Sequence, residues 1–136
     1  MTLSESEKMQ LMLERPVKGY WILLFKIIFS VATVIVIYES LIPSNATSVS
    51  GHFDKVAHFG AYFTLVCLAA LSFPKAKLWI IVGLMICLGA ALEGAQGLMN
   101  LGRSASIGDL IANILGVCAP VFSWVGCIWI ITSRNG

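Results

Sequence analysis

The stretch LWIIVGLMICLGAALEGAQGLM, residues 78–99, decides the fold of this chain, and Glu93 is its only charged residue. An α-helix rises 1.5 Å per residue, so about 20 consecutive apolar residues cross the hydrocarbon core of a bilayer. The stretch is long enough and apolar enough to do so. It therefore predicts a transmembrane helix over residues 78–99.

Three further apolar runs flank this stretch, at residues 20–41, 56–73 and 107–131. The chain of 136 residues is 58% hydrophobic and only 12% charged, whereas a soluble domain is about 25% charged. This composition excludes a disordered chain and a basic nucleic-acid-binding domain, so no nucleic-acid partner is expected. The prediction is an all-α fold, a bundle of four transmembrane helices that occupies residues 20–131.

The two ends of the chain are expected to lie outside the bilayer. The N-terminal segment, residues 1–19, has Ser4 and Glu7 at the spacing of a capping box and a helix-breaking Pro16. Two interpretations of this segment stay open, a short helix on the membrane surface and an unstructured tail. Residues 132–136 form a short C-terminal tail.

The positions of Lys and Arg predict how the bundle is oriented. Cytoplasmic segments of membrane proteins carry an excess of these residues. Seven of them flank one side of the predicted bundle, namely Lys8, Arg15, Lys18, Lys26, Lys75, Lys77 and Arg134. Only Lys55 and Arg103 flank the other side. We therefore expect both termini in the cytoplasm and the connections at 42–55 and 100–106 on the outside.

Polar residues inside or beside the apolar runs form a second pattern. Such residues are costly in a bilayer and usually face protein or water. Asp54 and His58 are four residues apart, as are Asp109 and Asn113, so each pair shares one helix face. Because successive helices alternate in direction, these residues all fall near the outer ends of their helices. The sequence predicts one outward-facing polar pocket that binds a ligand through Asp54, Lys55, His58, Glu93, Gln96, Arg103, Asp109 and Asn113.

Small residues recur every four positions in the last apolar run, at Gly108, Ala112 and Gly116, followed by Pro120. Small residues at this spacing let transmembrane helices pack closely. The proline predicts a kink in this helix below the polar residues. The helix contact and the polar face are therefore expected to be neighbours.

Three motifs occur in order along the chain, DKVAHF at 54–59, EGAQ at 93–96, and GR at 102–103 followed by DLIANILG at 109–116. They resemble the pattern DKxxHF, ExxQ and GR followed by DxxxNxxG of the VanZ-like family of small bacterial membrane proteins. The resemblance covers roughly residues 38–118. Residues 38–43, YESLIP, look like the end of the family's first span, where Glu39 adds a charge without an assigned role.

The resemblance implies a multi-pass protein of the bacterial cytoplasmic membrane with a role in the cell envelope. The namesake of the family is associated with resistance to teicoplanin, a lipid-bearing glycopeptide antibiotic. The resemblance implies no particular reaction. It does imply that the polar positions named above are the functional ones.

The residues themselves favour binding of a cell-envelope lipid or lipid-linked molecule, because Lys55 and Arg103 suit a phosphate or carboxylate and the other polar residues suit hydroxyls and amides. A first alternative is a membrane-embedded hydrolase or transferase, with His58, Glu93 and Asp109 as candidate catalytic residues. Their spacing matches no hydrolase signature, which favours a non-enzymatic role. A second alternative is a purely structural membrane subunit. A homo-oligomer or a membrane-protein partner is compatible with all three.

No cofactor is predicted. One open possibility is a divalent cation held by Asp54, His58, Glu93 and Asp109, because these side chains combine imidazole with carboxylates. The four cysteines lie inside the apolar runs and form no CxxC pair, which argues against a thiolate metal site.

Overall fold

The computed structural model describes residues 4, 6–7, 19–42, 51–99 and 106–133. Within these ranges the chain forms four long helices, α2 (Gly19–Leu41), α3 (Gly51–Ser72), α4 (Leu78–Met99) and α5 (Ile107–Ser133). All four are long and apolar enough to cross a membrane, which confirms the predicted all-α, multi-pass fold. The orientation of the termini in a membrane stays a prediction.

The observed helix bounds agree closely with the apolar runs, except at the start of α3. This helix begins at Gly51, five residues before the predicted start at residue 56. Its first turns carry the charged residues Asp54 and Lys55, which lie before the predicted apolar run. A helix continues through such residues when its end projects beyond the hydrocarbon core, and the carboxylate of Asp54 also favours the N-terminal end of a helix.

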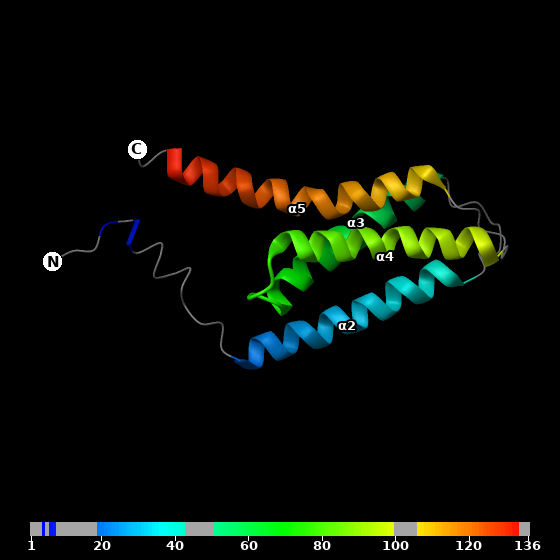
Figure 1. Ribbon diagram of the computed structural model, residues 1–136, viewed down its shortest axis with the longest axis horizontal. Helices are drawn as coiled ribbons and strands as arrows, with labels where there is room; N and C mark the ends of the chain where they lie inside the picture. Colours follow the sequence, from blue (N-terminus) through cyan, green and yellow to red (C-terminus); the bar gives the residue numbers. More distant parts are fainter. Residues whose placement is uncertain (1–3, 5, 8–18, 43–50, 100–105, 134–136) are drawn as a thin grey trace.

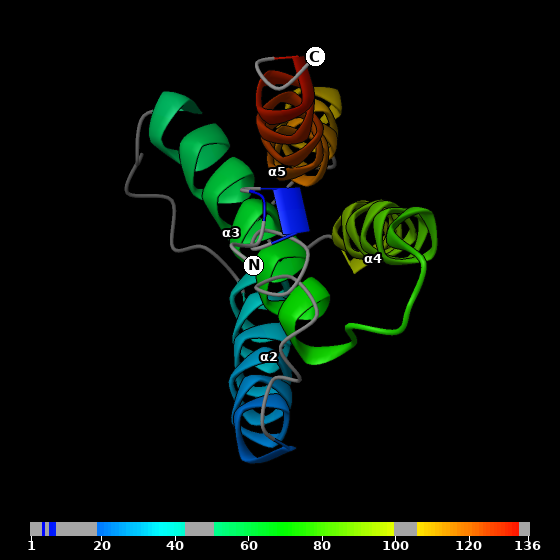
Figure 2. The ribbon, with the colours of Figure 1, turned by 90° about the vertical axis from the view of Figure 1, so that its left-hand side faces the viewer.

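The helices alternate in direction along the bundle. Figure 1 shows that α2 and α4 end at the same side of the molecule where α3 and α5 begin. Viewed from the end, α3 lies between the other three helices, and its most extensive contacts are with α5 and then α2 (Figure 2). We call the side where α3 and α5 begin the polar end, because the residues described below gather there.

The core of the bundle is built mainly on α3. Tyr62, Leu65, Val66 and Ala69 of this helix are almost fully buried against Val117 of α5. Apolar residues of α4 complete the same cluster. Most other large apolar side chains of the described residues are exposed, as expected for surfaces that face lipid.

Close packing of α5 is directed at α3. A Cβ atom added at Gly116 would lie 2.4 Å from the carbonyl oxygen of Phe59 in α3, closer than real Cβ atoms come. Gly89 of α4 is also tightly packed, since a Cβ there would lie 3.3 Å from both Tyr62 and Asn113. The predicted close approach of the small-residue stripe is thus observed, with α3 as its partner. Pro120 lies inside α5, and the helix is bent along its length (Figure 1).

The capping box predicted at the N-terminus is confirmed. The backbone N–H of Glu7 donates to Ser4 Oγ at 3.2 Å, and the backbone N–H of Ser4 donates to Glu7 Oε2 at 2.8 Å. These hydrogen bonds hold the pKa of Glu7 below its usual value. Residues 8–18 lie outside the described part of the chain, so both interpretations of this segment, a surface helix and an unstructured tail, stay open.

Candidate functional site

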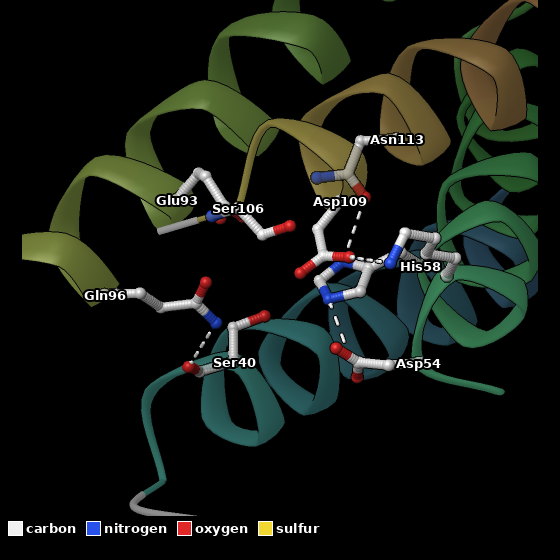
Figure 3. Close-up of polar contacts among 9 residues, drawn as sticks. Ser40, Asp54, His58, Glu93, Gln96, Ser106, Asp109 and Asn113 are labelled. Carbon is white, nitrogen blue, oxygen red and sulfur yellow. Dashed lines mark hydrogen bonds and ion pairs between the residues drawn. The ribbon is translucent and has the colours of Figure 1, made fainter. Parts of the chain in front are cut away.

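His58 of α3 joins two helices at the polar end. Its Nδ1 lies 3.0 Å from Oδ1 of Asn113 in α5, and Asn113 is only 3% exposed (Figure 3). A carbonyl-type oxygen only accepts hydrogen bonds, so Nδ1 of His58 is the donor and carries the proton. The other ring nitrogen, Nε2, faces Oδ1 of Asp54 at 4.0 Å, one helical turn earlier in α3. The sequence predicted that residues 54 and 58 share one helix face and that residues 109 and 113 share another. In the structure these two faces meet where α3 contacts α5.

Lys55 and Asp109 form a second link between the same two helices. Lys55 Nζ lies 3.9 Å from Asp109 Oδ1, and the lysine side chain is half-exposed whereas Asp109 is buried. Gly108 makes room for this lysine, because a Cβ at position 108 would lie 2.6 Å from Lys55 Cε. At 3.9 Å the contact is an ion pair without a hydrogen bond. Asp109 Oδ1 is fully buried and has no hydrogen-bond partner.

Three of the candidate residues bring possible metal-ligand atoms close together. One ligand atom each from Asp54, His58 and Asp109 lies within 4.8 Å of the other two. Glu93, the fourth member of the predicted cation set, is not in this group. We refer to Asp54, His58 and Asp109 as the α3–α5 cluster.

The polar residues of α4 make different contacts, both to main-chain groups. Glu93 is 7% exposed, and its Oε1 accepts a short hydrogen bond from the backbone N–H of Ser106, just before α5 (Figure 3). Gln96 is also buried, and its Nε2 donates to the backbone carbonyl of Ser40 in α2 at 2.8 Å. These residues tie α4 to the start of α5 and to the end of α2. The residues of the predicted single pocket therefore form two groups. One is the α3–α5 cluster with Lys55 and Asn113, and the other consists of Glu93 and Gln96 of α4, which bond to main-chain groups.

A cavity of about 330 Å³ opens beside the α3–α5 cluster, between α2 and α3. It is lined by Ile35, Val36, Glu39, Ser40, Asp54, Ala57, His58, Ala61 and Tyr62. Glu39, which had no role in the sequence analysis, thus lines the same cavity as Asp54 and His58. The hydroxyl of Tyr62 is buried without a hydrogen-bond partner. Tyr62 follows Asp54 and His58 at intervals of four residues, and this helical spacing is the only signal in the sequence that places it beside them.

Arg103, the predicted anion-binding residue, lies outside the described residues. Its role therefore stays a prediction. Of the candidate catalytic residues, His58 and Asp109 lie in the same cluster. Glu93 is held separately by the main chain of Ser106.

The fold and the site together define a multi-pass membrane protein with a partly buried polar cluster at one end of a four-helix bundle. This chain belongs to the VanZ/LLP1 family, whose model matches residues 2–130. The match confirms the resemblance seen in the motifs. No curated protein matches the chain, and no solved structure does.

Proposed function

We propose that this protein binds the polar head group of a cell-envelope lipid or lipid-linked molecule in the cavity between α2 and α3. The observation that carries the proposal is the mixed lining of this cavity. Glu39, Asp54 and His58 line it beside the apolar side chains of Ile35 and Val36. A ligand with a polar head and a hydrocarbon tail matches both kinds of surface.

The polar lining selects the chemistry of the head group. Carboxylates such as Glu39 and Asp54 only accept hydrogen bonds when ionised, so they suit hydroxyl, amide or ammonium groups. Lys55 follows Asp54 in the chain and its side chain is half-exposed, so it is proposed to contact a phosphate in place of its ion pair with Asp109. Arg103 is proposed to assist it. The proposed ligand therefore carries a phosphate together with hydrogen-bond donors.

The position of the cavity fits the same ligand. It lies at the polar end, where the ends of membrane-spanning helices meet the head-group region of a bilayer. The large apolar side chains of α2 are exposed along its length, including Val31, Val34 and Ile35. An acyl chain is proposed to lie along this surface while the head group enters the cavity.

Lipid retention by the purified protein tests this proposal. Ala61→Phe fills the cavity without removing a charge. Glu39→Gln replaces a carboxylate in its lining by a neutral amide. Ala61→Phe is expected to lose most of the co-purified lipid, because the phenyl ring occupies the space of the head group. Glu39→Gln is expected to lose most of it too, because loss of one charge-assisted hydrogen bond weakens binding roughly tenfold. Ser30→Ala is the matched control, because Ser30 lies on an exposed face of α2 and bonds only to its own helix at Lys26. Mass spectrometry of extracted lipids gives the measurement.

An unchanged lipid profile in Ala61→Phe and Glu39→Gln, with the fold intact by circular dichroism, would contradict the proposal. The purely structural alternative would then be favoured.

We further propose that expression of the protein lowers the susceptibility of cells to teicoplanin-like antibiotics through this ligand. The inhibitory concentration is then expected to fall to the level of the empty vector in cells that carry Ala61→Phe.

A further inference from the structure

We propose that Asp54, His58 and Asp109 form a binding site for a divalent transition-metal ion such as Zn²⁺ or Mn²⁺. The site shares Asp54 and His58 with the cavity of the lipid proposal, but Asp109 belongs to the metal set alone, and metal binding is measured without a lipid. Two residues come from α3 and one from α5, so a bound ion would join the two most extensively packed helices of the bundle.

The hydrogen bond between His58 and Asn113 prepares the histidine for a metal. Since Nδ1 donates to Asn113 Oδ1 at 3.0 Å, Nε2 of a neutral imidazole carries the lone pair, and this atom lies 4.0 Å from Oδ1 of Asp54. Metal-binding histidines usually donate their second N–H to an oxygen in this way, which fixes the ring and its tautomer. Asn113 is buried, so this second contact is protected from water.

The carboxylates of the cluster supply the complementary negative charge. Nε2 of His58 and Oδ1 of Asp54 are 4.0 Å apart, longer than the 2.7–2.9 Å of a direct charge-assisted hydrogen bond. Oδ1 of Asp109 is buried and accepts no hydrogen bond. A buried carboxylate oxygen without a hydrogen bond is unfavourable unless a cation satisfies it, and the ammonium of Lys55 contacts this oxygen only at 3.9 Å.

The distances in the cluster are close to those of a metal centre. Ligand atoms bound at about 2.1 Å to a tetrahedral ion lie about 3.4 Å from one another. The three ligand atoms here lie within 4.8 Å. Rotation of the side chains is expected to close the remaining difference when an ion binds.

The donor set indicates which ions fit. One imidazole nitrogen with two carboxylate oxygens suits Zn²⁺ and Mn²⁺, whereas Mg²⁺ and Ca²⁺ prefer oxygen ligands alone. Lys55 competes with the ion, because its ammonium lies 3.9 Å from Asp109 Oδ1. Its side chain is half-exposed and flexible, so it is expected to move toward solvent when an ion binds.

Metal binding to the full-length protein in a phosphate-free detergent tests the inference. After treatment with a chelator, we expect one Zn²⁺ or Mn²⁺ per chain, with weaker binding of Mg²⁺ and Ca²⁺. His58→Gln and Asp109→Asn are expected to abolish this binding. Asn113→Leu is expected to weaken it about tenfold, because the hydrogen bond that orients the His58 ring is lost. Lys55→Met is expected to tighten it, because the competing charge is removed. His52→Gln is the control, since His52 is the only other histidine of the sequence.

X-ray absorption spectroscopy of the wild-type protein with bound Zn²⁺ or Mn²⁺ needs no variant. We expect the ion to be coordinated by one nitrogen and otherwise by oxygen atoms. No stoichiometric binding, equal binding in His58→Gln, or equal loss in His52→Gln would overturn the inference. So would a thiolate ligand in the absorption spectrum. These outcomes leave the lipid-retention result unaffected, so the two proposals fail separately.

Discussion

Replacement of Gly116 by Leu is expected to separate α3 from α5 and to prevent stable folding. Even a Cβ at this position would lie 2.4 Å from the carbonyl oxygen of Phe59. That oxygen belongs to the backbone of α3, so it has no rotamer by which to move away. Overpacking of this kind costs about 1–3 kcal/mol for a small addition, so Gly116→Ala is expected to fall in this range and Gly116→Leu to exceed it.

Gly94→Ala and Gly83→Ala are the matched controls for this prediction. Both glycines are helical, and a Cβ at either position has nothing within 4 Å. Alanine has a better helix propensity than glycine by up to about 1 kcal/mol, so the controls are expected to be neutral or stabilising. Unfolding in mixed micelles, followed by circular dichroism, measures the difference. Equal stability of Gly116→Ala and Gly94→Ala would contradict the close contact between α3 and α5.

Loss of the Glu93 carboxylate is expected to be the second largest effect. This buried group accepts a hydrogen bond from the backbone N–H of Ser106, directly before α5. A helix N-terminus carries a partial positive charge, which a carboxylate stabilises. Glu93→Ala removes a charge-assisted hydrogen bond and leaves the N–H without its partner, so it is expected to lower the free energy of unfolding by about 2 kcal/mol.

Glu93→Gln separates the charge from the hydrogen bond. The amide keeps an acceptor oxygen but carries no charge, and neutral hydrogen bonds are roughly half as strong as charge-assisted ones. We therefore expect Glu93→Gln to lose about half as much stability as Glu93→Ala in the same unfolding assay. If Glu93→Ala were as stable as the wild type, Glu93 would not hold the start of α5.

The four helices were predictable because a bilayer fixes the length and polarity of any segment that crosses it. The pairs Asp54 with His58 and Asp109 with Asn113 were predictable from helical spacing alone. The start of α3 was not, since charged residues in its first turns precede the apolar run that marks the helix in the sequence. Small residues at four-residue spacing permit close packing but do not indicate which helix packs there. The contact of Gly116 with α3 was therefore seen only in the structure.

The contacts of Glu93 and Gln96 were beyond sequence analysis for a related reason. Both side chains bond to main-chain groups, of Ser106 and Ser40, and every residue offers such groups. No residue type in the sequence therefore marks the partner. The same holds for Glu39, whose place in the cavity wall depends on how α2 packs against α3.

The central claim is that polar side chains of α3 and α5 meet at one end of the bundle. Solid-state NMR of the protein in lipid bilayers tests it most directly, with ¹⁵N-labelled histidine, ¹³C-labelled asparagine and the His52→Gln background, in which His58 is the only histidine. We expect a protonated Nδ1 with a strong dipolar coupling to the Asn113 side chain, matching the 3.0 Å contact. A protonated Nε2 with an unprotonated Nδ1, or no coupling to Asn113, would contradict it.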